Sequence, residues 1–177
     1  MNQQRLRAYI REAPGCGRCD LSRLLADADA FSAVVASMAA PYLTQRIDLI
    51  AALDASGFAL GEAVAARLRT GLVLLRKPDK AAWFTRSQDF TDYRQRQSAL
   101  HLVTDAVSSG QRVLVIDDWS ETGAQALAAI QLLEQAGAAV VGASFIHLDA
   151  RVRRDSRFRA YQLQAILDYD APPADPD

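Results

Sequence analysis

The sequence predicts a single α/β domain built on a parallel, Rossmann-like sheet, and three observations support this prediction. The apolar run at residues 113–116 is typical of a strand buried on both faces, as in parallel sheets. A short polar loop and an alanine- and leucine-rich helical pattern at residues 125–136 follow it. The chain has 177 residues, of which 50% are hydrophobic, and this is enough for one substantial core.

The other elements alternate in the same way along the chain. The polar turn at residues 54–57 separates a strand from a helix. An alanine-rich helix ends before Pro41, and a further helical turn could begin at Asp20. The patterns predict helices at residues 4–11, 29–40, 58–68 and 125–136, and strands at residues 47–53, 71–75, 113–116, 138–145 and 161–167, the last at a sheet edge.

Two segments depart from this alternation. Residues 78–97 are polar and mixed in charge, and they carry aromatic side chains without a clear period. Long irregular segments inside a domain often cover functional sites, so we expect a mobile flap, with some strand character, over a site. Residues 168–177 contain three prolines and four aspartates, and we expect a flexible tail. The domain is therefore expected to span residues 1–167.

Composition disfavours several classes of partner. The net charge of -1 gives no reason to expect nucleic acid or an anionic membrane. No apolar run approaches the ~20 residues that cross a bilayer, and the first residues lack a signal-peptide core, so a cytoplasmic location is expected. Cys16 and Cys19 form a lone C-x-x-C in a glycine-containing turn. We interpret them as reduced structural thiols, with a metal or redox role as the alternative.

The segment after the central strand carries the chemistry. Asp117 and Asp118 end that strand, and a loop containing Thr122 leads into the next helix. At the carboxyl edge of a parallel sheet, the amides that open a helix favour an anion. Carboxylates accept hydrogen bonds from hydroxyl groups, so acids and amides together suit a ligand with a phosphate and a sugar diol. The alternative is structural, with the acids ending a strand and Ser120 or Thr122 capping the helix.

The stretch RVLVIDDWSETGAQ at residues 112–125 resembles the phosphoribosyl-diphosphate (PRPP) signature of type I phosphoribosyltransferases. The stretch IDLIAALDASGFALGEAVAARLRTGLVLLRKPDK at residues 47–80 resembles the adenine phosphoribosyltransferase branch, in which a strand precedes an acid-Ala-Arg-Gly-Phe turn and a later strand ends in Arg-Lys-Pro-Gly-Lys. The likeness spans roughly residues 20–145. It implies the type I phosphoribosyltransferase fold, with a flexible flap and a small hood.

The resemblance implies a purine phosphoribosyltransferase that moves ribose 5-phosphate from PRPP to a purine base and releases pyrophosphate. It also implies Mg²⁺, which is hard and oxygen-seeking, and a homodimer. Asp117 and Asp118 would hold the ribose hydroxyls and are the candidate ligands of the metal ion. Asp92 would assist proton movement at the base. The residues expected to bind the 5-phosphate are Ser120, Glu121, Thr122, Gly123, Ala124 and Gln125. The residues expected to bind pyrophosphate are Ser56, Gly57, Arg76, Lys77 and Lys80. The residues expected to bind the base are Cys19, Asp20 and Tyr93.

Several residues depart from the family pattern. Ser56 replaces an arginine, Ala124 and Gln125 replace the Gly-Thr of the family loop, and Glu121 places an anion near the phosphate. Losing one charge-assisted hydrogen bond costs ~1.5–3 kcal/mol, or about tenfold to a hundredfold in affinity. These departures motivate an alternative, a catalytically weak or inactive protein that senses PRPP or a nucleoside monophosphate. A phosphoribosyltransferase for another base, such as a pyrimidine, is a third hypothesis.

Overall fold

A six-stranded parallel sheet forms the centre of the molecule. The computed structural model describes residues 3–12, 19–78 and 85–167. The strand order is β10-β9-β7-β3-β4, and the short β8 pairs with β9. All of these pairings are parallel, as predicted. The strands are β3 (Leu49–Leu53), β4 (Gly71–Leu75), β7 (Arg112–Ile116), β8 (Trp119–Ser120), β9 (Ala139–Leu148) and β10 (Gln162–Leu167).

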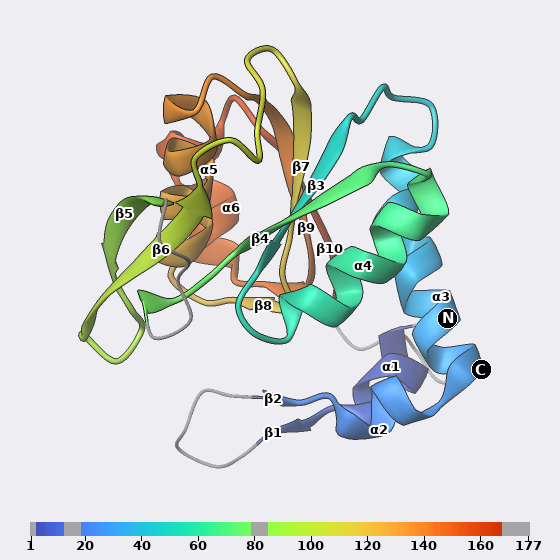
Figure 1. The fold of residues 1–177 in the computed structure, drawn as a ribbon. Helices are drawn as coiled ribbons and strands as arrows, with labels where there is room; N and C mark the ends of the chain where they lie inside the picture. The colour runs from blue at the N-terminus through green and yellow to red at the C-terminus, as the bar shows by residue number, and fades with distance from the viewer. Residues whose placement is uncertain (1–2, 13–18, 79–84, 168–177) are drawn as a thin grey trace.

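Helices cover both faces of the sheet (Figure 1). One face packs against α3 and α4, and the other packs against α5. The helices are α1 (Gln3–Tyr9), α2 (Ser22–Ala26), α3 (Ala28–Ala39), α4 (Gly57–Leu68), α5 (Ala124–Gln135) and α6 (Ala150–Arg154), with 3₁₀ turns η1 (Ala40–Tyr42) and η3 (Ser156–Phe158). The predicted helices and strands are confirmed to within two residues at each end, except that β9 continues to Leu148.

Alternation along the central strand builds the two halves of the core. In β7, Val113 and Val115 pack on the α5 side, whereas Leu114 and Ile116 pack on the α3 and α4 side. All four side chains are fully buried. A strand with apolar side chains on both faces can lie only inside such a sandwich, which is why this run predicted a parallel sheet.

The connections around β7 create a switch point in the sheet. The chain leaves β3 through α4 on one face and returns as β4, whereas it leaves β7 through α5 on the other face and returns as β9. Strands β3 and β7 are neighbours, paired from Leu49 to Ala52. Their following loops therefore diverge at the carboxyl edge and leave a crevice, where open α/β sheets bind ligands.

The segment predicted as an irregular flap is largely a β-hairpin. Strand β5 (Thr85–Thr91) pairs antiparallel with β6 (Gln97–Val103), and residues 92–96 form its tip. The buried Phe90, Leu100 and Leu102 join the core beside α5. The pattern was missed because only one face of the hairpin is apolar and a polar tip interrupts it. Mobility of this segment stays a prediction.

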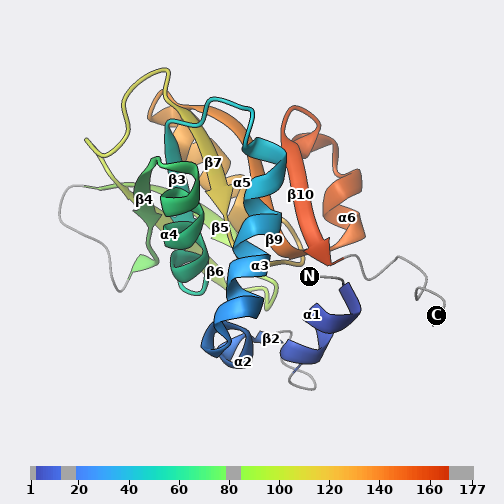
Figure 2. The same cartoon turned by 90° about the vertical axis from the view of Figure 1, so that its right-hand side faces the viewer.

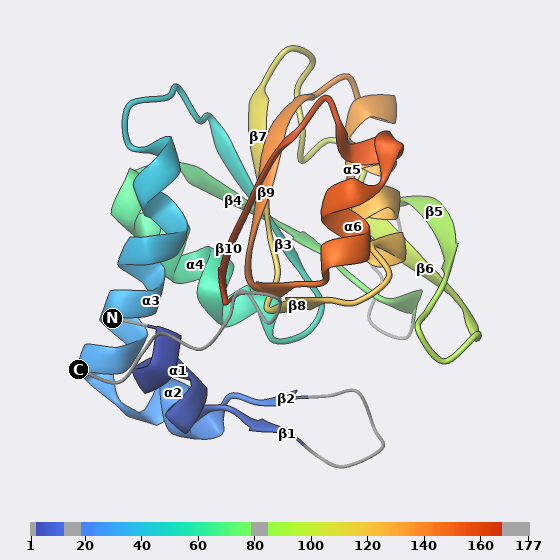
Figure 3. The same cartoon turned by 180° about the vertical axis from the view of Figure 1, so that it is seen from behind.

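A small hood lies beyond the carboxyl ends of the sheet strands (Figures 2 and 3). It consists of α1, α2 and the antiparallel pair β1 (Arg11–Glu12) and β2 (Cys19–Asp20). Leu6 and Leu24 anchor it by joining the core on the α3 side. In the described part of the chain, no helix is long and apolar enough to cross a bilayer.

Candidate active site

A cavity of about 290 Å³ opens at the switch point, close to the lower end of the ~300–1,000 Å³ typical of small-molecule sites. Four segments line it: residues 54–56 after β3, Lys77 after β4, the end of β5 with the start of the hairpin tip, and residues 117–126 from β7 into α5. The ends of three parallel strands thus converge on one crevice, as the position of the sequence motifs predicted.

The paired acids occupy different environments at the end of β7. Asp117 is 5% exposed, and its Oδ1 accepts the Asp118 backbone N–H at 2.9 Å. Asp118 is half-buried. Burial raises the pKa of Asp117 well above its usual value, repulsion from Asp118 adds to this rise, and the Lys77 cation opposes it. The cavity therefore has a floor of carboxylate oxygens that a hydroxyl group or a cation would stabilise.

Gly57 lies directly behind the first of these acids. A Cβ atom at this position would come within 2.9 Å of Asp117 Oδ1 and 3.0 Å of the Ile116 carbonyl oxygen. Helix α4 can therefore begin against the end of β7 only because residue 57 is a glycine. Gly57 supports Asp117 from behind and is outside the cavity lining.

The loop between β8 and α5 turns sharply at Gly123. This residue has a φ of 73°, and an added Cβ would meet Phe158 at 2.9 Å and Val152 at 3.0 Å. The first hydrogen bond of the α5 ladder runs from Leu127 N–H to the Gly123 carbonyl oxygen at 2.8 Å. The amides of residues 124–126 precede it, and such amides at a helix start favour anions.

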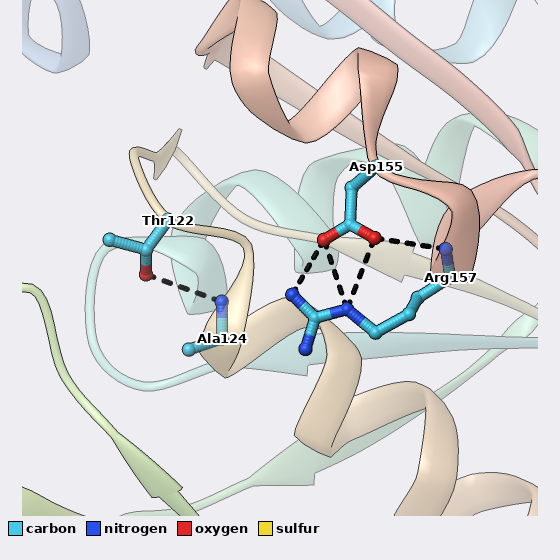
Figure 4. A network of polar contacts seen from close by, with 4 residues as sticks. All are labelled: Thr122, Ala124, Asp155 and Arg157. Atoms are coloured by element: carbon cyan, nitrogen blue, oxygen red, sulfur yellow. Dashed lines mark hydrogen bonds and ion pairs between the residues drawn. The ribbon is translucent and has the colours of Figure 1, made fainter.

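Two polar contacts flank this loop (Figure 4). Thr122 Oγ1 accepts the Ala124 backbone N–H at 3.3 Å and so closes the turn. On the neighbouring segment, Asp155 accepts the Arg157 backbone N–H at 2.9 Å and forms an ion pair with its guanidinium. The Asp155–Arg157 contact orders the turn that carries Phe158 against Gly123.

The turn after β3 is tied to the end of β4. Asp54 is 4% exposed, and its Oδ2 accepts the Lys77 backbone N–H at 3.3 Å. Ser56 is exposed in the cavity and lies at the N-cap of α4 without a side-chain capping bond. Arg76 is outside the cavity lining, and its guanidinium lies 5.7 Å from the ring centroid of Phe58.

The tip of the hairpin forms the opposite wall. Phe90, Asp92 and Tyr93 line the cavity. Asp92 Oδ1 accepts the backbone N–H groups of Arg94 and Arg96 at 2.8 and 2.9 Å, and Oδ2 accepts the Arg96 guanidinium at 2.9 Å. The bond from the Arg96 amide, followed by its guanidinium, lowers the pKa of Asp92. Asp92 therefore organises the tip, and its low pKa makes it a poor proton donor.

The structure separates the residues predicted for the base pocket. Tyr93 lines the cavity, whereas Asp20 does not: its Oδ1 accepts the Ser22 backbone N–H at 2.8 Å and starts α2. The side chain of Cys19, and all of Cys16 and Lys80, lie outside the described residues. The predicted pyrophosphate group is split as well, with Ser56 and Lys77 in the cavity and Arg76 outside it.

Sequence reasoning missed several cavity residues. Asp54, Ala55 and Phe90 line the cavity, as does Ala126 in the first turn of α5. Asp54 follows a predicted strand directly, and this position was the available signal because strand ends meet at the carboxyl edge. Phe90 is one of the aromatic side chains in the segment expected to cover a site, but its place in the cavity depends on a hairpin that was not predicted.

Trp119, which directly follows the acid pair in the sequence, is the largest side chain in the cavity lining. Its ring centroid lies 4.2 Å from that of His147, with the two planes tilted by 36°. The pairing of β8 with β9 brings these residues together. His147 supports the half-buried indole from the side of the sheet, so Trp119 presents an aromatic edge or face next to the acids.

Comparison with known proteins agrees with the fold. The model of the phosphoribosyl transferase domain family matches residues 24–175. An adenine phosphoribosyltransferase from Rhodopirellula baltica is 37% identical, over 93% of this chain and 82% of its own length. The crystal structure of adenine phosphoribosyltransferase from Thermoanaerobacter pseudethanolicus has a TM-score of 0.83 at 31% identity, covering 93% of this chain and 98% of that one. The enzyme from Giardia lamblia, complexed with 9-deazaadenine, has a TM-score of 0.85 at 27% identity, covering 94% and 97%.

The parallel sheet, the acid pair and the loop into α5 define a type I phosphoribosyltransferase. The chain belongs to the phosphoribosyltransferase family, and it is a purine phosphoribosyltransferase similar to the adenine enzymes. The resemblance seen in the sequence is confirmed.

Proposed function

We propose that this enzyme transfers ribose 5-phosphate from PRPP to a ring nitrogen of adenine, with adenosine monophosphate and pyrophosphate as products. The bond from the ribosyl carbon to pyrophosphate breaks, a carbon–nitrogen bond forms, and the ring nitrogen loses its proton. The observation that carries the proposal is one cavity that joins an acid pair to a helix-opening loop. Similarity to adenine phosphoribosyltransferases supports adenine as the base.

The loop into α5 is proposed to hold the 5-phosphate. The backbone amides of Gln125 and Ala126 and the Thr122 hydroxyl can donate to phosphate oxygens, whereas the Ala124 amide already donates to Thr122. Asp117 and Asp118 are proposed to accept hydrogen bonds from the ribose hydroxyls, because a carboxylate can only accept. Phosphate on one side and diol on the other would fix the orientation of the ribosyl ring.

Pyrophosphate is proposed to lie between the turn at residues 54–56 and Lys77. In an oxocarbenium-like transition state, the leaving pyrophosphate gains negative charge, so a nearby cation stabilises it. Lys77 is the cation of the cavity lining among the described residues, and the Ser56 hydroxyl can donate one further bond. The position of Arg76 against Phe58 supports a structural role instead of the expected pyrophosphate contact.

The base is proposed to bind beside Trp119 and Tyr93, whose rings, with that of Phe90, provide the aromatic surface of the cavity. The ionised Asp92 can accept a proton, but its lowered pKa makes it a weak base. We therefore assign Asp92 to holding the hairpin tip. Cys19 and Asp20 belong to the hood, and the proposal gives them no further role.

Magnesium is the proposed ion. In the described residues, no three acidic, histidine or cysteine side chains are grouped as a metal site. The adjacent carboxylates of Asp117 and Asp118 fit a hard divalent ion that takes its remaining ligands from water and substrate oxygens. When bound, the ion would neutralise charge on the phosphates.

A homodimer and a cytoplasmic location complete the proposal. Both come from the sequence and its resemblance, and light scattering on the purified protein tests the first. Exposed apolar side chains such as Leu43 and Leu72 are available for a partner surface.

Turnover with a panel of bases tests the proposed reaction. Purified enzyme with PRPP and magnesium is incubated with adenine, hypoxanthine, guanine, xanthine or a pyrimidine, and pyrophosphate release is measured. We expect release with adenine and little with the others. Pyrophosphate release with another base would show that this base, and not adenine, is the substrate. Saturable PRPP binding without pyrophosphate release with any base would instead indicate a sensor.

A further inference from the structure

Gln125 has a position that the phosphate role does not explain. It lies in the first turn of α5, half-buried, where the sequence predicted a phosphate contact. Its Nε2 instead donates to Asp117 Oδ2 at 3.3 Å and to the Asp54 carbonyl oxygen at 3.4 Å. The side chain thus joins the ends of β3 and β7 across the floor of the cavity.

The orientation of this amide is set by the Asp54 carbonyl oxygen. The Asp54 carbonyl oxygen can only accept hydrogen bonds, so the NH₂ group has to face it, and the same NH₂ group donates to Asp117 Oδ2. The other oxygen of Asp117 is occupied by the Asp118 amide, and Gly57 closes the space behind it. Gln125 therefore adds a contact on the second carboxyl oxygen of Asp117.

We propose that Gln125 is a positioning residue that acts through Asp117, holding this acid for the ribose and tying it to the turn that carries Ser56. The inference rests on the proposed function, because Asp117 is taken to contact the ribosyl ligand. Gln125 contributes no direct contact with the phosphate. Its two bonds link the sugar end of the cavity to the pyrophosphate end, so both ends share one rigid floor.

Substitution of Gln125 separates this role from a direct phosphate contact. Gln125→Met keeps the length of the side chain without a donor, and Gln125→Asn keeps the amide but shortens its reach. Losing one hydrogen bond to a charged group predicts a KM for PRPP that is about tenfold higher in both variants, with the KM for adenine within about twofold. Gln131→Met, on the exposed side of the same helix, is the matched control and is expected to behave as the unsubstituted enzyme.

A double-mutant cycle with Asp117→Asn shows whether Gln125 acts through Asp117. The dissociation constant of PRPP with magnesium is measured by calorimetry for the unsubstituted enzyme, both single variants and the double variant. We expect Gln125→Met to weaken binding about tenfold alone and less than about threefold when residue 117 is asparagine. A full tenfold loss in that background would show a direct contact with PRPP and overturn the inference.

Other outcomes are equally decisive. Unchanged PRPP affinity and KM in both Gln125 variants would overturn the inference, as would equal losses for PRPP and adenine accompanied by a lower melting temperature. The cycle measures binding, so it remains readable if the unsubstituted protein turns over no base. An absence of turnover with every base would contradict the proposed reaction, and the double-mutant cycle would still test whether Gln125 positions Asp117.

Discussion

Gly57 and Asp117 lie so close together that residue 57 has no room for a side chain. A Cβ atom there would lie 2.9 Å from Asp117 Oδ1, shorter than real Cβ contacts. The start of α4 and the acid that ends β7 are therefore one unit, and the position of the acid depends on a glycine 60 residues away in the sequence (117 − 57).

Gly57→Ala is expected to move Asp117. We predict a loss of about 1–3 kcal/mol in the free energy of unfolding, together with weaker PRPP binding. Denaturant unfolding and calorimetry measure the two effects. Gly71→Ala is the control, because its Cβ would come closest to the end of the flexible Leu49 side chain, at 3.0 Å, and would make only an ordinary contact with the Asp48 carbonyl oxygen, at 3.9 Å. Equal effects from the two variants would contradict the prediction.

Gly123→Ala is expected to disturb the loop into α5 for two reasons, its positive φ and the contact with Phe158. We predict a loss of about 2–4 kcal/mol in the free energy of unfolding, from backbone strain plus overpacking. Gly110→Ala isolates the first effect, since its φ is 79° but nothing lies within 4 Å of its Cβ. If both variants lose the same stability in urea unfolding, the contact with Phe158 has no energetic role.

Asp118→Asn and Asp117→Asn are expected to weaken PRPP binding without unfolding the domain. Each loses a charge-assisted hydrogen bond, so the dissociation constant should rise by about tenfold to a hundredfold. Asp117→Asn also removes a buried charge, and its melting temperature should stay equal or rise. The exposed Asp105→Asn is the control. Unchanged affinity in the Asp117→Asn, Asp118→Asn double variant would remove the diol role.

Removal of magnesium is expected to slow turnover strongly. Because the ion would neutralise charge on the phosphates, we predict a rate about a hundredfold lower in excess EDTA. Added Mg²⁺ should restore the rate, and Ca²⁺ should do so poorly because it prefers more ligands at longer distances. Pyrophosphate release measures the rate. Full activity in EDTA, with metal content checked by mass spectrometry, would exclude the ion from the reaction.

Asp92 is expected to make stability depend on pH in acid. Its folded pKa is lower than its unfolded pKa, so its contribution is present above the unfolded value of about 4 and is lost as the pH falls through the folded value. The melting-temperature difference between the unsubstituted protein and Asp92→Asn should therefore shrink below about pH 4. Asp89→Asn, exposed on β5, is the control. A difference that is constant from pH 7 to pH 2.5 would contradict the assignment of Asp92 to the hairpin tip.

Local sequence was sufficient for much of this molecule because most elements of the sheet are continuous apolar runs next to clear turns. Residues 113–116 and 71–75 could be read in this way, and the loop into α5 could be placed from its neighbours. The hairpin of β5 and β6 could not, because its apolar face is completed by α5 and appears only after folding. For the same reason the place of Phe90 in the cavity and the hydrogen bonds of Asp92 within the hairpin tip could not be predicted.

The sequence by itself determined the α/β order, the acids after β7 and the family, because these depend on residues close together in the chain. Only the tertiary structure decided which candidates reach the cavity. It turned Arg76 onto Phe58, left Asp20 at the start of α2 and directed Gln125 to Asp117. Side-chain direction at a strand or helix end depends on partners from distant segments, and packing alone brings those partners together.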